Sequence, residues 1–375
     1  MAGIYIHIPF CKQACYYCDF HFSTSSHNFN EITSAVIKEI QLQRNYLDQE
    51  KVSTIYFGGG TPSILPVGLL EKIVLKIHET FPLKDTVEFT LEANPDDLTI
   101  EKLTALKELG INRLSIGVQS FQPEILHFLN RVHQDEDAIR SIENSHKSGF
   151  ENINVDLIYG IVDDGHKSLI NDLKILSDLH PTHVSAYCLT IEPKTVFGNW
   201  QKKGTLKTVS EEYAADQFEL TIDDLEKAGY EQYEVSNFAR NQQYSLHNSN
   251  YWKGVSYLGI GPSAHSFNGV SRQYNISNNA AYIKSINEEK IPCEREELDT
   301  NTRANELIMT GLRTKWGCDL KILMHQFGYN VALQQKPLIE ELIKKDLMCV
   351  NDEKMFLTKK GLLVADEIIA GFFLV

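Results

Sequence analysis

The sequence predicts an α/β fold in which parallel strands are joined by crossover helices, as in a full or partial (β/α) barrel. Six short runs rich in β-branched and aromatic residues alternate with helical patterns over about 240 residues. One join, a helix followed by a glycine and then a strand, recurs around Gly110, Gly149 and Gly229. Because glycine often ends helices, this repeat indicates consecutive βα units. In such folds the binding groups lie at the carboxyl ends of the strands.

The strand and helix patterns follow one another along the chain. The predicted strands are GIYIHIPF (3–10), STIYFGGG (53–60), EFTLEANP (88–95), RLSIGVQS (113–120), NINVDLIYG (152–160) and HVSAYCLTIE (183–192). Between them, GLLEKIVLKIHETF (68–81) places apolar residues at i, i+3, i+4 and i+7 from Leu70, and EKLTALKELG (101–110) repeats the pattern. Each of these helices is therefore expected to bury one apolar face.

The patterns divide the chain into three predicted parts. Residues 1–235 form the barrel-like core, residues 236–290 form a polar, aromatic and glycine-rich connecting segment, and residues 291–375 form a smaller C-terminal domain. The last part reads as a helix (337–347), a short hairpin (348–358) and an amphipathic helix (359–372), the order of a winged helix. Its acidic balance argues against a role in reading DNA.

Composition limits the classes of function. The 375 residues are 42% hydrophobic, and no stretch of eighteen apolar residues or secretory signal is visible. An odd number of cysteines, seven, suits a reducing compartment, so a cytoplasmic location is predicted. The formal net charge of −14 disfavours non-specific binding of nucleic acid.

Three cysteines follow the first strand closely, in the pattern C-x3-C-x2-C: Cys11, Cys15 and Cys18. Thiolates favour zinc and iron–sulfur centres. A structural zinc needs four ligands, which His7 or His21 could complete, because the other four cysteines are scattered along the chain. A [4Fe–4S] cluster held by three thiolates instead leaves one iron open for an added ligand.

The cysteine pattern, followed one βα unit later by FGGGTP (57–62), resembles the radical S-adenosylmethionine (SAM) superfamily. The resemblance implies a partial (β/α)6 radical SAM barrel with a smaller C-terminal helical, winged-helix-like domain. It also implies that the amino and carboxylate groups of SAM chelate the open iron. An electron from the cluster can then cleave SAM to a 5′-deoxyadenosyl radical.

Further motifs resemble the coproporphyrinogen-dehydrogenase-like branch of that superfamily: YIHIPFC, LEANP, RLSIGVQSF, LNRVHQ and NVDLIYG. By this resemblance, seven residues fall on SAM-contacting positions: Tyr5, Gly60, Thr61, Glu92, Gln119, Arg131 and Asp156. Their chemistry suits those roles. Arg131 can form two hydrogen bonds to the SAM carboxylate, and Glu92 and Asp156 can accept from its amino group or ribose hydroxyls.

Two groups of this branch are distinguished by residues beside the cluster. The coproporphyrinogen III dehydrogenases carry a further cysteine two positions after the third and a longer N-terminal arm. Here Phe20 occupies that position and ten residues precede Cys11. The HemW haem chaperones have phenylalanine there, and also an H-N-x-x-Y-W motif.

The chain contains this motif as HNSNYW: His247, Asn248, Tyr251 and Trp252. The resemblance implies haem binding by these residues, since imidazole is a common axial haem ligand and aromatic rings pack on porphyrins. His265 in YLGIGPSAHSF is a second ligand candidate. Taken without the resemblance, a histidine beside aromatic residues is more often a buried structural group.

The predicted function is therefore a cytoplasmic haem chaperone that binds haem, a [4Fe–4S] cluster and SAM and transfers haem to an acceptor protein. The expected partners are a haem-requiring acceptor, which could be membrane-bound, an electron donor, and a second copy in a homodimer. No catalytic residue is assigned. The alternative is an enzyme, either an oxygen-independent coproporphyrinogen III dehydrogenase or another radical SAM enzyme acting on a tetrapyrrole. A tRNA-modifying enzyme is disfavoured by the acidic charge.

Overall fold

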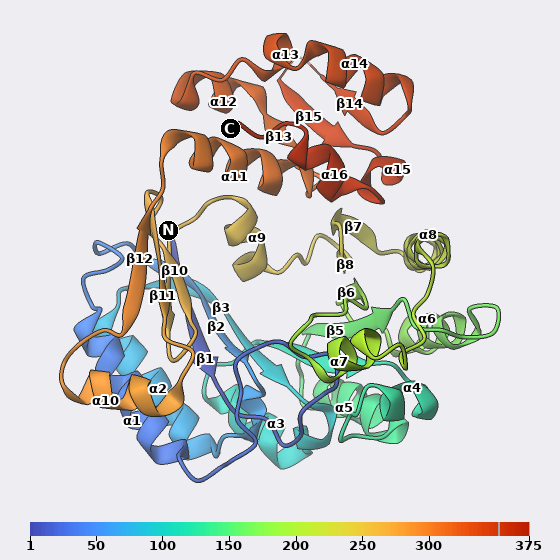
Figure 1. The fold of residues 1–375 in the computed structure, drawn as a ribbon. Coiled ribbons are helices and arrows are strands. Elements are labelled where there is room, and N and C mark those ends of the chain that lie inside the picture. Colours follow the sequence, from blue (N-terminus) through green and yellow to red (C-terminus); the bar gives the residue numbers. More distant parts are fainter. Residues whose placement is uncertain (352, 375) are drawn as a thin grey trace.

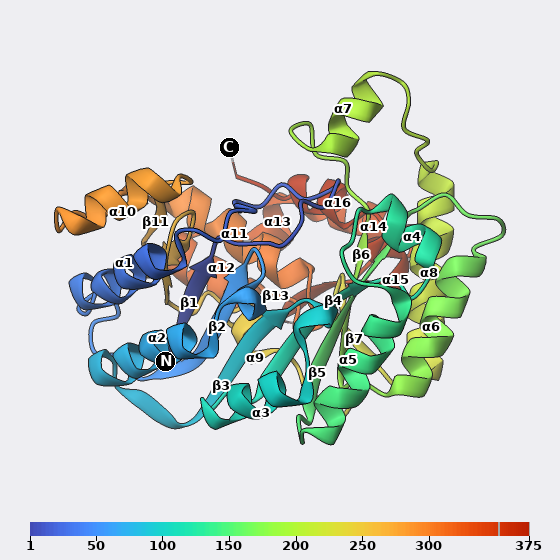
Figure 2. The same ribbon diagram turned by 90° about the horizontal axis from the view of Figure 1, so that it is seen from below.

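A computed structural model of the chain describes residues 1–351 and 353–374. Six parallel strands, paired in chain order, form the centre of one curved sheet, with helices against its outer face (Figure 1, Figure 2). The strands are β1 (Ala2–Ile8), β2 (Val52–Gly59), β3 (Leu83–Ala93), β4 (Arg113–Gln119), β5 (Asn152–Tyr159) and β6 (His183–Cys188). The intervening helices are α1 (Phe29–Leu42), α2 (Val67–Thr80), α3 (Ile100–Glu108), α4 (Pro123–Phe128), α5 (Asp135–Lys147) and α6 (Lys167–Leu179). The predicted partial (β/α)6 barrel is confirmed.

The apolar spacing of the sequence accounts for how these elements pack. Helix α2 buries the predicted face, Leu70, Ile73, Val74 and Ile77, in the main core. The three predicted glycine joins are also confirmed, because the φ angles of Gly110, Gly149 and Gly229 are +87°, +77° and +86°. Residues with a Cβ adopt this left-handed conformation at a cost, so glycine lets each helix end and the next strand begin at once.

Short strands extend the sheet beyond both edges of the parallel part. Beside β1 lie β9 (Tyr257–Ile260), β10 (His265–Phe267), β11 (Ser271–Asn275) and β12 (Cys293–Glu297); beside β6 lie β8 (Asn237–Ala239) and β7 (Glu231–Glu234). The pairing of β9 with β1 is parallel, and that of β8 with β6 is antiparallel. The segment predicted as a connection, 236–290, thus supplies strands to both edges. The three-part domain division stays a prediction.

Four further helices lie between the end of β6 and the C-terminal part. They are α7 (Val196–Lys202), α8 (Glu211–Lys227), α9 (Leu246–Trp252) and α10 (Asn279–Asn287). Helix α9 carries the HNSNYW motif and contacts β2 from the side opposite the mouth of the barrel. Its first amides are bound by the buried carboxylate of Glu88 on β3, which accepts from the N–H groups of Leu246 at 2.9 Å and His247 at 2.8 Å.

The C-terminal part has its own apolar core around a three-stranded antiparallel sheet. Its strands are β13 (Cys318–Asp319), β14 (Met348–Val350) and β15 (Lys354–Leu357), and its helices are α11 (Thr300–Leu312), α12 (Leu320–Phe327), α13 (Val331–Gln334), α14 (Lys336–Lys344), α15 (Lys359–Leu362) and α16 (Ala365–Ala370). The predicted hairpin is β14 and β15, which pair antiparallel; residue 352 of the predicted segment lies outside the described residues. The single helix predicted over 359–372 is wrong: Val364, with φ −120° and ψ 29°, separates α15 from α16.

The C-terminal domain sits over α9 and β7 in Figure 1. Its loop between α11 and β13 contacts the core directly: the N–H of Lys315 donates to the carbonyl of Tyr233 at 3.0 Å, and Arg313 pairs with the buried Glu234 at 3.4 Å. The apolar tail of the sequence packs inward, with Ile369 and Phe372 buried. Among all the residues described, none of the helices has the length and apolar character needed to cross a membrane.

Replacing Gly229 by alanine is expected to destabilise the protein by about 1–2 kcal/mol, the cost of a Cβ in the left-handed region. The site is open, so a clash contributes nothing. Gly68, equally open but in the first turn of α2, is the control; Gly68→Ala is expected to be neutral or stabilising by less than about 1 kcal/mol. Chemical denaturation of both variants measures the difference, and equal midpoints would contradict the argument.

Candidate functional site

A cavity of about 740 Å³ opens at the carboxyl ends of the parallel strands. Its walls come from the loop after β1, from the ends of β2 to β6 and from the segment that follows β6. Cavities of about 300–1,000 Å³ commonly hold small molecules and cofactors. The position and size of this cavity make it the candidate site.

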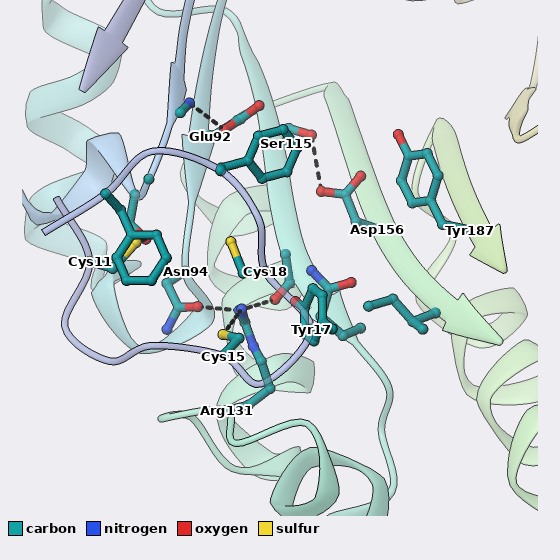
Figure 3. A pocket seen from close by; sticks show the side chains of 18 of the residues that line it. Cys11, Cys15, Tyr17, Cys18, Glu92, Asn94, Ser115, Arg131, Asp156 and Tyr187 are labelled. Atoms are coloured by element: carbon teal, nitrogen blue, oxygen red, sulfur yellow. Dashed lines mark hydrogen bonds between the residues drawn. The ribbon is translucent and has the colours of Figure 1, made fainter. Parts of the chain in front are cut away.

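The three cysteines singled out in the sequence all line the cavity: Cys11, Cys15 and Cys18. Apolar neighbours anchor the loop that carries them. The buried ring of Phe10 packs 4.5 Å from the ring of Phe29, and Tyr16 packs 5.1 Å from Trp200 on α7, measured between ring centroids. With these apolar side chains turned into the protein, the thiols face the cavity (Figure 3).

The surroundings of the thiols oppose ionisation in the absence of a cation. Burial raises the pKa of Cys11 and raises that of Cys18 to about 11. At Cys11 a hydrogen bond partly offsets this effect, because Thr61 donates to its sulfur at 3.5 Å. Arg131 donates to the sulfur of Cys15 at 3.3 Å. Since thiolates are the metal-binding form, bound iron would supply the missing positive charge.

The arrangement fits a polynuclear cluster better than a single ion. Within residues 1–351 and 353–374, no three His, Cys, Asp or Glu side chains are placed to hold one metal ion. A cluster attaches each thiolate to a different iron, so its cysteines need not converge on one point. The histidines considered for zinc have other partners: His7 Nε2 bonds the carbonyl of His21 at 2.9 Å, and His21 Nε2 bonds Asn279 Oδ1 at 2.8 Å.

The glycine run at the end of β2 brings the cysteine loop close to the strand. A Cβ at Gly60 would lie 2.5 Å from the carbonyl oxygen of Phe10, and one at Gly59, where φ is +111°, would lie 2.7 Å from the His7 ring. The amides of Gly60 and Thr61 donate to Ile8 and Phe10 at 2.9 and 2.7 Å. Both Gly60 and Thr61 line the cavity. Because these glycines have no side chain, the cysteine loop can approach the end of β2 closely, and the cavity stays accessible there.

Two half-buried carboxylates stand across the cavity from Cys15 and Arg131 (Figure 3). Glu92 accepts from the hydroxyl of Tyr56 at 2.8 Å and from the amide of Gly59 at 3.2 Å, yet burial, reinforced by Asp156, raises its pKa to about 7. Asp156 accepts from Asn154 at 2.7 Å, and burial raises its pKa as well. These acids are thus poised to interact with a positively charged ligand.

Arg131 lies at the cysteine side of the cavity wall. One terminal nitrogen, Nη1, donates to Cys15, and the other donates to the carbonyl of Gly117 at 2.7 Å and to the side chain of Asn94. Asn94, which sequence analysis did not single out, also lines the cavity. The guanidinium is therefore held rigidly next to the cysteine loop, where an anionic group could replace a bond to Asn94.

Gln119 ends β4 in a left-handed conformation, with φ of +69°, and lines the cavity. The turn after it is held by Asp172 of α6, which accepts from the Ser120 hydroxyl at 2.6 Å and the Phe121 amide at 2.9 Å. The sequence analysis did not identify Asp172 as important for the site. An aspartate on the apolar face of α6, one position before the buried Leu173, could have indicated a buried role.

The HNSNYW motif forms α9, but most of its side chains lie behind the cavity wall. Asn248 lines the cavity. His247 is 2% exposed; its Nδ1 bonds Thr54 at 2.9 Å and its Nε2 bonds the hydroxyl of Tyr251 at 2.9 Å. Burial lowers the pKa of His247 to about 3, so the ring is neutral. Trp252 faces the C-terminal domain, with the Arg313 guanidinium 6.0 Å from its ring.

Two other predicted residues also lie away from the cavity lining. Tyr5 bonds His7 Nδ1 at 3.3 Å and stacks on the ring of Tyr56, 6.0 Å between centroids, so it supports a residue of the wall. His265 is exposed and stacks on Tyr274 at 5.6 Å, at the outer sheet extension. The remaining predicted SAM residues, Gly60, Thr61, Glu92, Gln119, Arg131 and Asp156, all line the cavity.

The end of β6 and the segment after it supply a part of the wall that sequence analysis did not assign. Tyr187, 43% exposed, and the exposed Cys188 line the cavity together with Leu189. On the facing side, Phe20 is 72% exposed and Val132 is 38% exposed. The exposed part of the lining therefore includes apolar and aromatic side chains beside the charged Lys12 and Asp19, whereas Glu92 and Asp156 are half-buried.

Comparison with known proteins shows the family to which the chain belongs. Residues 5–175 match the Radical SAM superfamily and residues 298–364 the HemN C-terminal domain. The "Heme chaperone HemW" of Bacillus subtilis (strain 168) is 36% identical over 375 residues, covering 99% of each chain, and that of Lactococcus lactis is 35% identical, covering 99% of this chain and 97% of the other. The chain belongs to the HemW family. HemN, the coproporphyrinogen III oxidase of Escherichia coli, shares the fold, with a TM-score of 0.87 at 24% identity, over 99% of this chain and 90% of that one.

Membership of the HemW family confirms the choice between the two branches made from the sequence. The residue that favoured the chaperone branch, Phe20, follows the cysteine loop and is among the most exposed apolar side chains described. In the dehydrogenases a cysteine stands at this position. In this HemW protein the mouth of the cavity presents an aromatic ring there instead.

Alanine at Cys11, Cys15 or Cys18 is expected to remove most of the bound iron after anaerobic reconstitution, because each thiolate holds a different iron. Cys188 is a matched control, since it lines the same cavity and is exposed. Cys188→Ala is expected to keep the parent's iron content and visible spectrum. Iron and sulfide analysis measures this; unchanged iron in the first three variants, or loss in the control, would refute the assignment.

Proposed function

We propose that this chain is a haem chaperone that holds a [4Fe–4S] cluster and SAM in the barrel cavity, binds haem, and passes the haem to an acceptor protein that needs it. Membership of the HemW family over the whole chain carries the proposal. The cavity supports it, because three thiols, a fixed guanidinium and two half-buried acids line one cavity whose exposed lining includes Phe20 and Tyr187.

Cys11, Cys15 and Cys18 would hold the cluster, which, when bound, supplies single electrons and an open iron. Arg131, beside Cys15, would bind the carboxylate of SAM in place of its bond to Asn94. Glu92 and Asp156, on the opposite wall, would accept hydrogen bonds from the amino and hydroxyl groups of SAM. The separation of charges across the cavity thus matches an amino acid ligand that carries both signs.

Haem would lie at the mouth of the cavity, where exposed aromatic and aliphatic side chains can pack on a porphyrin face. Phe20 and Tyr187 stand at the mouth, and the half-buried Glu92 and Asp156 disfavour entry of the haem propionates. The carboxylates of haem would therefore point to solvent. His247 stays the predicted axial ligand, but it is enclosed on α9, away from the mouth. Ligation of a haem at the mouth would therefore require α9 to move, in addition to the loss of the bonds from the His247 ring to Thr54 and Tyr251.

The partners and setting follow from this function. An acceptor that requires haem, at a membrane or elsewhere, and a donor of electrons to the cluster are both proposed. A cytoplasmic location and a homodimer stay predictions from the sequence. The alternative, a coproporphyrinogen III dehydrogenase, is favoured by one observation, the shared fold with HemN. Conversion of coproporphyrinogen by the reduced, SAM-loaded protein would support that alternative.

Anaerobic haem titration of reconstituted protein is expected to show stoichiometric binding by visible spectroscopy. His247→Ala is expected to weaken binding and shift the main haem band, because the axial imidazole is lost. His27→Ala, at an exposed loop histidine, is the control and is expected to bind as the parent does. No uptake by the parent would contradict haem carriage; a His247 variant indistinguishable from the parent would remove His247 as the ligand and leave His265 to be tested.

The affinity for SAM is expected to rise between pH 6 and pH 8. The pKa of Glu92 is raised to about 7, so this carboxyl is neutral below that pH and its attraction for the positive charge of SAM is lost there. The loss approaches about tenfold per pH unit below the pKa. Glu92→Gln should abolish this slope, whereas Glu192→Gln, at the same cavity, should keep it. Calorimetry across this range checks the slope, and a flat profile for the parent would contradict the role of Glu92.

A further inference from the structure

A chain of hydrogen bonds runs through the barrel interior from the cavity floor to the C-terminal domain. It links Asp156 of β5 to Asn154 at 2.7 Å, Asn154 to His183 of β6 at 2.6 Å, and His183 to the hydroxyl of Tyr233 at 2.7 Å. Asn154, His183 and Tyr233 are 2%, 0% and 1% exposed. Bulk water therefore does not compete for these bonds, and each group depends on its neighbours in the chain.

The chemistry of the groups fixes the direction of every bond. The Oδ1 atom of Asn154 can only accept, so His183 must carry its proton on Nδ1. Burial keeps His183 neutral by lowering its pKa, so Nε2 has a lone pair and must accept from the hydroxyl of Tyr233. The amide nitrogen of Asn154 then donates to Asp156 and, at 2.7 Å, to Ser115. The opposite amide orientation would set its oxygen against the Asp156 carboxylate.

The far end of this donor chain is held by the C-terminal domain. The ring of Tyr233 lies 5.9 Å from the ring of Trp316, and its carbonyl accepts from the amide of Lys315 at 3.0 Å. Lys315 and Trp316 belong to the loop between α11 and β13. The ring of Tyr244 packs against both of these rings, with its centroid 4.7 Å from that of Tyr233 and 5.8 Å from that of Trp316. The position of the Tyr233 hydroxyl thus depends on how this domain docks.

We propose that Tyr233 and His183 are positioning residues through which the docked C-terminal domain sets the orientation of the Asn154 amide and the Asp156 carboxylate in the cavity. Docking of the domain is thereby coupled to ligand binding at the cavity floor. The ligand named in this proposal, SAM, rests on the proposed function. The donor chain itself can be tested without any ligand.

Tyr233→Phe removes one hydroxyl and keeps the ring. The Nε2 lone pair of His183 then has no donor, while Nδ1 still donates to Asn154. The ring loses the bond that holds it at the Tyr233 end, so the Asn154 amide and the Asp156 carboxylate are positioned less firmly. The affinity for SAM is expected to fall about fivefold to tenfold, the factor for one hydrogen bond. Tyr282→Phe is the matched control: Tyr282 is also fully buried and its hydroxyl donates to Glu39 at 2.6 Å, but it belongs to the α10 side of the sheet. It should keep the parent's affinity.

A double-mutant cycle separates positioning from general loss of structure. If Tyr233 acts through the carboxylate, Tyr233→Phe should cost no further affinity in an Asp156→Asn background. Trp316→Ala should lower affinity in the parent and less so in the Tyr233→Phe variant. Additive effects, or a Tyr233→Phe variant that binds as the parent does, would overturn the coupling, as would an unchanged affinity in the Trp316 variant.

The tautomer of His183 gives a readout that needs no ligand. Histidine ¹⁵N NMR, assigned with a His183→Gln variant, should show the Nδ1–H form in the parent. After Tyr233→Phe the same form should remain, with the Nε2 signal moved toward that of an imidazole nitrogen without a hydrogen bond. An Nε2–H form in the parent, or an unmoved Nε2 signal in the variant, would overturn the donor chain whether or not SAM binds. Failure of the parent to bind SAM, with the Nε2 signal moved, would count against the proposed function and confine the inference to the donor chain.

Discussion

The close approach of the cysteine loop to the end of β2 is the constraint on which the rest of the site depends. Gly60 leaves no room for a Cβ beside the carbonyl of Phe10, and the amides of Gly60 and Thr61 bind the backbone of β1 and its loop. This contact turns the loop back over the strand ends and so roofs the cavity. The glycine run is thus as important to the cysteines as their spacing, because it decides where the thiols point.

The charges of the cavity are arranged by depth and by side. A guanidinium and three thiols occupy the loop side, two half-buried acids face them, and the exposed lining includes Phe20 and Tyr187. Burial raises the pKa of Asp156 and raises that of Glu92 to about 7, so the Glu92 carboxyl is partly protonated near neutral pH. A ligand that brings positive charge favours its ionised state. Ligand binding and proton release are therefore linked at this site.

Much of the fold and site followed from local sequence pattern. The strands and the glycine joins follow from spacing along each segment, whereas the cavity-lining residues among the SAM positions followed from the resemblance to a known family. Contacts between residues far apart in the sequence could not be predicted in this way. For example, β9 pairs with β1 at the start of the chain, and His247 contacts Thr54 of β2. The role of Asp172 was hidden for the same reason, because its partner, the turn after Gln119, belongs to a different βα unit.

The pairing of β1 between β2 and β9 also governs the order in which the protein can be completed. One edge of β1 has no partner strand until residues 257–260 are synthesised. A ribosome that adds about 5–20 residues per second reaches them only after tens of seconds. During that time the chain has made β1 to β6 but leaves the hydrogen-bonding edge of Gly3–Ile6 uncovered. A nascent barrel with an apolar open edge is a substrate for molecular chaperones and for unwanted strand pairing. The edge of β1 that leads into the cysteine loop is thus covered by a segment about two-thirds of the way along the chain.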